Sequence, residues 1–367
     1  MVTATEKDAL TMSQTVSRDV LEVVHRGTVI PASPLALDAR RRFDEHRQRV
    51  LMRYYCDAGA GGVAVGMHFT QFEIRRPGID LFEPVLRTCA QEIDAQAGRL
   101  KRPIIKIAGI NGRTPDAIKQ AETARELGYD FAIVSLAAFG DALDQELIHH
   151  MRQVAGVMPT FGFYLLTGVG GIRLDYPFWR ELVEIDNLHG IKIAPFNRYG
   201  TLDVARALAE SGRAESIALY TGNDDSIIYD LLTPLRFNVG GETRTVRIRG
   251  GLLGQWACWT KSAVALLERC HQLAERDCVP TEMLTLSAEL TDANGAIFDA
   301  AHTYAGSIVG IHEILRRQGL LENTCTLNRE EALSPGQAAE IDRVCGAYPH
   351  LTDDAFVQEN LDRWLNM

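Results

Sequence analysis

From residue 28 to residue 277, short apolar runs alternate with longer amphipathic segments. The eight apolar runs lie at residues 28–33, 62–67, 103–110, 131–136, 160–166, 188–195, 216–222 and 245–253. Several are β-branched and too short for globular helices, which is typical of buried parallel strands. Intervening segments such as 44–58, 115–127, 145–157, 176–185, 202–211 and 256–276 are typical of helices.

Eight strand–helix units in series predict an α/β protein built on a closed (β/α)₈ TIM barrel. The alternative is an open doubly wound sheet, which usually carries a glycine-rich phosphate turn after its first strand. Residues 28–37 contain no glycine, so the barrel is favoured. One irregularity interrupts the series, because residues 237–243 form the pattern of a hairpin insertion with Gly240 and Gly241 at its turn.

After residue 277 the pattern changes to helical segments, at 300–318, 335–345 and 353–365, and no strand is evident. We therefore expect three parts in the chain. These are an N-terminal extension (1–25), the (β/α)₈ barrel (26–277) and a C-terminal helical appendage packed against the barrel (278–367).

Composition and charge narrow the class of protein. The chain is 46% hydrophobic and 23% charged with a formal net charge of −10, and it has no basic patch with interleaved aromatic residues, so we expect no nucleic-acid partner. Its seven cysteines are odd in number and never spaced as CxxC, which indicates reduced thiols. The first 18 residues lack an apolar core, and no run of 18 apolar residues follows. We expect a cytoplasmic protein without a membrane partner.

The most conspicuous candidate for chemistry is Lys192, the only charged residue of an otherwise apolar strand pattern. It shares one face with Gly190 and Ala194, and these small neighbours suggest that the face points into the crowded barrel interior. A buried ammonium without a partner tends to lose its proton, and a neutral amine is what attack on a carbonyl requires. The alternative is a lysine that reaches solvent or pairs with a carboxylate.

The preceding strand suggests a partner for this lysine. Alternation along residues 160–166 puts Gly162, Tyr164 and Leu166 on one face, and we expect that face to meet the same cavity as Lys192. Phe161 and Phe163 would then contact the outer helices. A tyrosine hydroxyl beside the amine can pass protons to and from reaction intermediates, although a buried tyrosine is more often a core residue.

Two further strand ends offer groups for binding a substrate. The second strand ends in a loop where His68, Thr70 and the backbone amides can receive a carboxylate. The seventh strand leads into Gly222 and Asn223, followed by two acids. No histidine or carboxylate at ligand spacing accompanies those acids, so we expect no metal site.

The Gly-Ile-Lys strand at 190–192, the tyrosine on the strand before it and the turn at 221–224 together resemble the dihydrodipicolinate synthase/N-acetylneuraminate lyase family. The likeness covers residues 26–277. Segments 29–35, 60–66, 103–109 and 250–256 are similar to the family's first, second, third and eighth strands. The resemblance implies a cofactor-free class I lyase, aldolase or dehydratase that acts on a 2-keto acid, on a TIM barrel that is often a homodimer or homotetramer.

The resemblance also implies roles for individual residues. Lys192 would form the Schiff base and Tyr164 would relay protons. Thr70 would match the second of the family's paired threonines, which hold the keto-acid carboxylate, with Phe69 in the place of the first. Trp256, at the end of the eighth strand, would narrow the pocket and favour a bulkier or more apolar substrate.

The sequence also departs from the family pattern. The threonine loop at 66–73 has different spacing, and the loop after Tyr164 lacks the arginine that receives an acidic aldehyde, so lysine biosynthesis is not expected. The altered loop motivates a second hypothesis, a non-catalytic ligand-binding or regulatory relative with a degenerate site. A third is an oxidoreductase barrel that uses flavin or nicotinamide.

Overall fold

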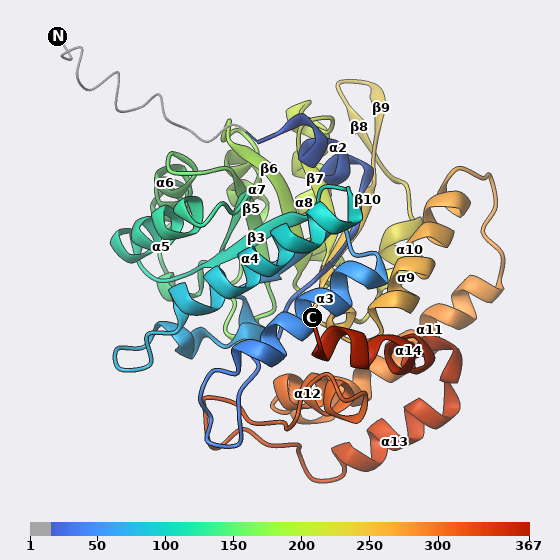
Figure 1. The fold of residues 1–367 in the computed structure, drawn as a ribbon. Helices are drawn as coiled ribbons and strands as arrows, with labels where there is room; N and C mark the ends of the chain where they lie inside the picture. Colours follow the sequence, from blue (N-terminus) through green and yellow to red (C-terminus); the bar gives the residue numbers. More distant parts are fainter. Residues whose placement is uncertain (1–15) are drawn as a thin grey trace.

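The computed structural model describes residues 16–367 and contains a barrel of eight parallel strands surrounded by helices (Figure 1). The strands are β1 (Val29–Pro31), β2 (Gly62–Val65), β3 (Ile105–Ile110), β4 (Phe131–Val134), β5 (Thr160–Leu165), β6 (Leu188–Ala194), β7 (Ala218–Thr221) and β10 (Ile248–Leu253). Their order is β1-β10-β7-β6-β5-β4-β3-β2. A parallel bridge between Ala32 and Ala64 joins the two ends of this sheet, so the ring is closed. The predicted TIM barrel is confirmed.

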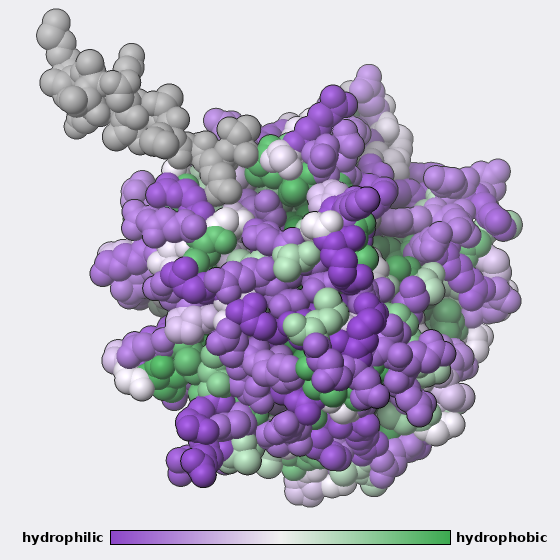
Figure 2. Space-filling view, viewed as in Figure 1, coloured by the Kyte–Doolittle hydropathy of each residue, from purple (hydrophilic) through white to green (hydrophobic). Residues whose placement is uncertain are grey.

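Helices follow the barrel strands along the chain and bury one face against the barrel. They are α3 (Glu45–Ala58), α4 (Phe82–Leu100), α5 (Thr114–Glu126), α6 (Asp144–Ala155), α7 (Tyr176–Leu182), α8 (Arg198–Ser211), α9 (Ile227–Leu232) and α10 (Thr260–Ala274). Two of them start at side-chain caps, since Asp44 accepts from the amide of Arg47 and Asn197 from that of Tyr199. The face in Figure 2 is mainly hydrophilic, with hydrophobic residues in small groups, as expected when apolar faces turn inward.

The insertion before the last barrel strand is a two-stranded antiparallel hairpin of β8 (Leu235–Val239) and β9 (Glu242–Val246). Its turn consists of Gly240 and Gly241, with φ angles of 62° and 89°. Both values lie in the left-handed region that glycine adopts without strain, which is why this dipeptide specifies a tight hairpin. The hairpin predicted from the sequence is confirmed.

Helices outside the barrel lie at both ends of the described chain. Helix α2 (Arg18–Arg26) precedes β1 and is fastened by a 2.9 Å hydrogen bond from the Tyr220 hydroxyl to the carbonyl of Val24. After the barrel come α11 (Glu282–Ile297), α12 (Ser307–Arg317), α13 (Gln337–Ala347) and α14 (Asp354–Leu365), which gather on one side of it (Figure 1).

The last helix is tied to the barrel by buried polar contacts. Arg53 of α3 pairs with Glu92 of α4 and donates to the carbonyl of Trp364, whose side chain is fully buried. Tyr54 donates to Asp353 at 2.7 Å. The division into extension, barrel and appendage stays a prediction, and residues 1–15 of the expected extension lie outside the described residues.

Two properties of residues 16–367 bear on the environment of the protein. None of the helices described there is both long and apolar enough to cross a bilayer. All seven cysteines are free thiols. The cytoplasmic location expected from the sequence stays a prediction.

Candidate active site

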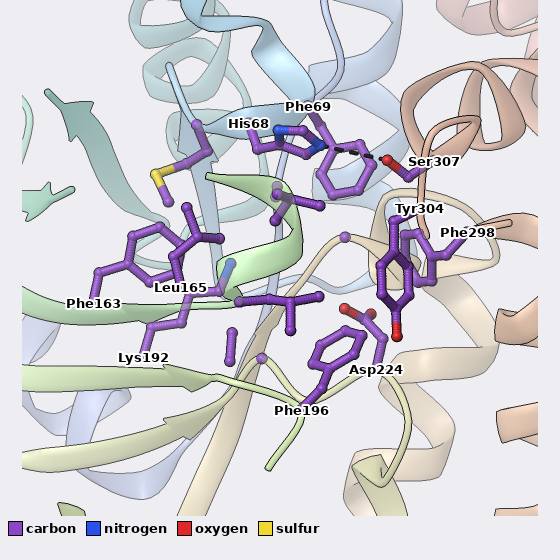
Figure 3. A pocket seen from close by; sticks show the side chains of 17 residues that line it. His68, Phe69, Phe163, Leu165, Lys192, Phe196, Asp224, Phe298, Tyr304 and Ser307 are labelled. Carbon is purple, nitrogen blue, oxygen red and sulfur yellow. Dashed lines mark hydrogen bonds between the residues drawn. The ribbon is translucent and has the colours of Figure 1, made fainter. Parts of the chain in front are cut away.

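A cavity of about 550 Å³, including its mouth, opens at the carboxyl ends of the barrel strands (Figure 3). Its walls come from residues that end or follow β1, β2, β5, β6, β7 and β10, and from the segment that joins α11 to α12. The carboxyl end of the strands is the face that carries the active sites of TIM-barrel enzymes.

Lys192 lies on β6 and points into this cavity, with only 7% of its surface exposed. Its amine lies 4.7 Å from the ring centre of Phe163, the residue paired with it across β5 and β6. Among residues 16–367, we find no hydrogen bond or close ion pair to this amine. A Cβ on Gly222 of the neighbouring strand end would lie 2.6 Å from Lys192 Cε and 2.7 Å from Ala194 Cβ, so a glycine there leaves room for the lysine.

The surroundings of Lys192 make its neutral form easier to reach than that of an exposed lysine. Burial lowers the pKa of Lys192, and the negative charge of Asp224 partly opposes that shift. Burial raises the pKa of Asp224 in turn, although the amide of Gln255 donates to its carboxylate at 3.1 Å and the charge of Lys192 also opposes the rise. Lys192 and Asp224 are therefore both buried, and the charge of each affects the protonation of the other.

Histidine 68 lies at the other end of the cavity, next to the hydroxyl of Ser307, with 3.5 Å between Nε2 and Oγ (Figure 3). Burial, with a smaller effect of the Lys192 charge, lowers the pKa of His68 to about 4. His68 is therefore a neutral hydrogen-bonding group near neutral pH. His68, Phe69 and Gly222 line the cavity, and their role in binding a substrate stays a prediction.

The expectation that Tyr164 faces the same cavity as Lys192 is wrong. Phe163 and Leu165 line the cavity, whereas Tyr164 points to the outer helices and packs on Trp179 of α7 with 5.1 Å between ring centres. It lines a separate surface pocket with Arg173 and Asp175. The strand is buried on both sides, so apolar residues occupy both faces and their alternation does not reveal which face is inside.

The side chains on the inward face of β5 also explain why residue 190 of β6 is a glycine. Phe161 is paired with Gly190, and a Cβ on Gly190 would lie 2.3 Å from the Phe161 ring. Phe161 and Phe163 therefore fill the barrel interior rather than meeting the outer helices. The reading of β6 as a face of Gly190, Lys192 and Ala194 is correct, because small residues there make room for the rings of β5.

Thr70 is not available to a substrate, contrary to expectation. Its hydroxyl accepts from the amide of Gly66 at 2.9 Å and donates to the carbonyl of Ser33 at 2.7 Å, and the residue is fully buried outside the cavity. It therefore fastens the end of β2 to the chain that follows β1. The sequence correctly marked the loop but not the direction of this side chain.

Asn223 and Trp256 also lie outside the cavity lining. The side-chain amide of Asn223 donates to Thr201 and Asp230 and accepts from the backbone amide of Phe196. Asn223 therefore supports a residue of the lining without being part of it. Trp256 is buried and lines a different pocket beside α10, and it does not narrow the cavity around Lys192. The indole packs where a Cβ on Gly251 would lie, 2.5 Å from its ring.

The sequence analysis missed the wall formed by the segment between α11 and α12. Phe298 and Tyr304 of that segment, together with Ser307 at the start of α12, line the cavity opposite Lys192 (Figure 3). Asp299 holds the segment by accepting from the amide of Gly306 at 3.0 Å and from the hydroxyl of Ser334. Nothing in the local pattern marks these residues, because they follow a helix rather than a barrel strand.

Among residues 16–367, no group of three or more histidine, cysteine or acidic side chains is arranged to hold a metal ion. Asp224 and Asp225 diverge in their contacts. The side chain of Asp224 lines the cavity, whereas the carbonyl of Asp225 accepts from Thr291 of α11 at 2.8 Å.

Comparison with known proteins finds a partial similarity in sequence and a broad similarity in fold. A 4-hydroxy-tetrahydrodipicolinate synthase from Cyanothece sp. is 31% identical over 150 residues, which cover 40% of this chain and 47% of that protein. The match thus spans about half the length of this curated relative. No protein-family model matches the chain.

Solved structures match the fold over nearly their whole length. N-acetylneuraminate lyase from Fusobacterium nucleatum has a TM-score of 0.67 at 14% identity and covers 88% of this chain and 99% of its own. A prophage protein of the dihydrodipicolinic acid synthase family from E. coli, solved in complex with pyruvate, has a TM-score of 0.69 at 16% identity, covering 87% and 97%. This chain therefore has the fold of the dihydrodipicolinate synthase/N-acetylneuraminate lyase family, with a partial sequence similarity to one synthase.

The cavity differs from the site that the sequence resemblance implies. The lysine of the Gly-Ile-Lys strand is retained, but the residue paired with it on β5 is Phe163, which has no hydroxyl. Thr70 of the altered loop points away from the cavity, and its hydroxyl donates to the carbonyl of Ser33. The polar groups that face Lys192 are instead Asp224, Tyr304, Ser307 and His68.

Proposed function

We propose that this protein is a class I lyase or aldolase that binds a 2-keto acid as a Schiff base on Lys192. The observation that carries the proposal is the buried Lys192 amine, which has no hydrogen-bonded partner within residues 16–367 and opens on a cavity at the carboxyl ends of the strands. Its lowered pKa supports attack by the neutral amine on the keto carbon. The family relationship supports the same reaction class.

The chemistry requires proton transfer at two stages. The carbinolamine must lose water to give the iminium ion, and a proton must leave the carbon next to it to give the enamine. We assign these transfers to Asp224, because burial raises its pKa towards the range where a carboxyl group can both accept and donate a proton. Tyr164 has no part in the proposal, since it lies outside the cavity.

The carboxylate of the keto acid needs hydrogen-bond donors at the end of the cavity away from Asp224. The hydroxyl of Ser307 and the neutral imidazole of His68 are the polar side chains at that end. A carboxylate there would lie away from the Asp224 charge, while its keto carbon would face the amine. We therefore propose that His68 and Ser307 orient the substrate.

The test is reductive trapping. The purified full-length chain is incubated with pyruvate and with a panel of larger 2-keto acids in the presence of borohydride, and the adduct is located by peptide mass spectrometry. We expect a mass increase on the Lys192 peptide. Lys106 is a matched internal control, because it also lies on a barrel strand and is 8% exposed, but its amine is paired with Asp94.

Adducts on Lys106 and on surface lysines as often as on Lys192 would contradict a dedicated site. The Lys192→Met variant should lose the adduct and keep its thermal stability. If no keto acid in the panel labels Lys192, the lyase proposal fails. A non-catalytic relative would then be indicated if the panel still stabilised the protein against heat.

We also propose that the chain assembles as a homodimer or homotetramer, as its family relationship suggests. Light scattering on a size-exclusion column measures this directly. A monomer at micromolar concentration would contradict the proposal.

A further inference from the structure

We propose that the cavity is an aromatic slot and that the second reactant, or the substituent on the keto acid, is an uncharged aryl group. This inference rests on the proposed function for its chemistry, but not for its geometry. The aldehyde partner would accordingly be an aryl aldehyde rather than a charged or sugar-like one.

Five aromatic rings line the cavity, and they come from four separate parts of the chain. They are Phe69 after β2, Phe163 on β5, Phe196 after β6, and Phe298 and Tyr304 between α11 and α12. In Figure 3, Phe163 lies on the side of Lys192 and the other four rings lie opposite it. Aromatic walls of this kind favour a flat apolar occupant through burial and ring-to-ring contact.

The four opposite rings form two pairs that join distant segments. Phe196 and Tyr304 meet edge to face with 5.6 Å between ring centres, and Phe69 and Phe298 lie 5.8 Å apart. Each pair joins a barrel loop to the α11–α12 segment. The slot is therefore assembled by the packing of that segment on the barrel, and its shape does not depend on a single loop.

Two of the rings are held by backbones in an unfavourable conformation. Phe196 has a φ of 50° and Tyr304 a φ of 66°, in the left-handed region that bulky residues rarely adopt. Such strain persists only where the surroundings enforce it, and it is concentrated at functional sites. Asn223 fixes the amide of Phe196 and Asp299 fixes the turn that carries Tyr304, so buried polar side chains enforce both conformations.

The charges of the cavity argue against a substrate that carries a second carboxylate. Of the described residues that line it, Lys192 and Asp224 are the only ones with charged side chains, and both are engaged in the proposed chemistry. A second carboxylate on the substrate would have no cation to pair with, which is costly in an enclosed site. Arg173, the nearest candidate on the loop after β5, is paired with Asp175 beside a different pocket.

The reaction that follows is an aldol addition and its reverse. The enamine carbon of Lys192-bound pyruvate forms a bond to the carbonyl carbon of the aryl aldehyde, whose oxygen takes up a proton and becomes a hydroxyl group. Water then adds to the iminium carbon and releases the product, and the lysine amine is regenerated. The product from benzaldehyde is 4-hydroxy-2-oxo-4-phenylbutanoate, and no oxidant or reductant is required.

The experiment compares three aldehydes with pyruvate as the common donor: benzaldehyde, the anionic glyoxylate and the polar neutral glycolaldehyde. Product is measured by mass spectrometry with the full-length chain. We expect kcat/KM for benzaldehyde to exceed that for the other two by about 100-fold, because a site discriminates strongly against groups it leaves unpaired. Comparable values for all three would overturn the slot.

Two variants test the rings themselves. Phe298→Leu keeps an apolar side chain of similar size and should reduce the preference for benzaldehyde about tenfold while Lys192 is still trapped by pyruvate. Tyr199→Ala is the matched control, because Tyr199 is 84% exposed on α8 and should leave the preference unchanged. An unchanged preference in Phe298→Leu would argue against the slot.

The two proposals fail separately. If pyruvate labels Lys192 but benzaldehyde is not preferred, the lyase proposal stands and the aromatic slot is wrong. If no keto acid labels Lys192, the lyase proposal fails. The aromatic slot is then tested separately, by the shift in Tm that each ligand causes. Stabilisation by phenylpyruvate but not by pyruvate, reduced in Phe298→Leu, would support it, and equal shifts would refute it.

Discussion

The side-chain oxygen of Asn223 accepts a hydrogen bond from the backbone amide of Phe196 at 3.0 Å. The two residues follow neighbouring strands, β7 and β6, and Phe196 lines the cavity while Asn223 lies behind it. Asn223 is anchored in turn by Asp230, which accepts from its amide nitrogen at 2.9 Å. A polar network in the barrel wall thus fixes an aromatic side chain of the site.

We predict that Asn223→Ala destabilises the fold and loosens the site. The substitution leaves the amide of Phe196 without this partner and removes one of the two donors to an oxygen of Asp230, which should lower the free energy of unfolding by about 1–3 kcal/mol. Urea denaturation measures this loss. The Michaelis constant for the aldehyde should rise more than kcat falls, because Asn223 positions Phe196 and does not touch the reacting atoms. An unchanged Michaelis constant would leave Asn223 a purely structural role.

Removal of the Asp224 charge should make Lys192 reactive at lower pH. In the folded protein this carboxylate favours the ammonium form of Lys192, against the effect of burial. In Asp224→Asn, the pH at which Lys192 becomes nucleophilic should therefore fall by about one pH unit. The rate at which an amine-selective acylating reagent labels Lys192, followed by mass spectrometry across the neutral to alkaline range, measures this change.

Asp225→Asn is the control for that experiment, since Asp225 is adjacent in sequence but does not line the cavity. It should shift the labelling profile of Lys192 far less. Turnover should nevertheless be slower in Asp224→Asn, because the carboxyl group assigned to proton transfer is gone. A labelling profile that stays where it is in the parent protein would mean that the Asp224 charge does not reach the amine.

Tyr164→Phe should have little effect on the reaction. The hydroxyl lies on the outer side of β5, near α7 and α8, where it cannot reach an intermediate on Lys192. We expect both the extent of pyruvate trapping and kcat to stay within about twofold of the parent protein. A loss of a hundredfold or more in kcat, with trapping intact, would restore the tyrosine to the proton relay.

The two strands that carry these residues show what a sequence can and cannot predict. Lys192 could be placed correctly, because one charge in an apolar strand with small residues on the same face has few stable positions. Tyr164 could not, because β5 is apolar on both faces and one residue of shift in the parallel register exchanges them. The pairing of Phe163 with Lys192 emerges only from the closed sheet.

The remaining wall of the site was beyond prediction for a different reason. The positions of Phe298, Tyr304 and Ser307 depend on how the C-terminal helices pack, and Asp299 sets the turn through contacts with Gly306 and Ser334. These contacts join residues that follow the barrel in the chain. The strand–helix alternation ends before them and therefore does not predict their positions. The barrel itself follows from that alternation, since each unit is defined by local periodicity.

Thr70→Val should test whether this hydroxyl is structural. The hydroxyl bridges the amide of Gly66 and the carbonyl of Ser33, so its removal should cost about 1–3 kcal/mol in the free energy of unfolding. Thr70→Ser keeps the bridge and should recover most of that loss. Pyruvate trapping, measured under conditions where both variants are folded, should be the same. A large loss of trapping in the valine variant alone would point to carboxylate binding.

Acid should destabilise the protein partly through His312. Burial lowers the pKa of His312 to about 4, so the unfolded chain takes up a proton below pH 6.5 that the folded protein does not. This group therefore contributes stability near pH 7 that is lost as the pH falls towards 4. The loss between pH 7 and pH 5 amounts to about 2 kcal/mol.

The substitution His312→Gln removes this titration and should flatten the decline of Tm between pH 7 and pH 5. His46→Gln is the matched control, because His46 lies on the exposed side of α3. Scanning calorimetry at a series of pH values compares the two. An equally steep decline in both variants would exclude His312 as a source of acid sensitivity.

The site is divided between the strand ends and the turn after α11, and this division affects how amino-acid substitutions can change the choice of reactants. The amine sits on a strand whose neighbours leave it almost no freedom, whereas the turn of Phe298 and Tyr304 is anchored through its own side chains. Substitutions in that turn can therefore exchange one family of reactants for another while bond-making at the lysine stays intact. A library of variants confined to the turn would be the economical route to new reactants.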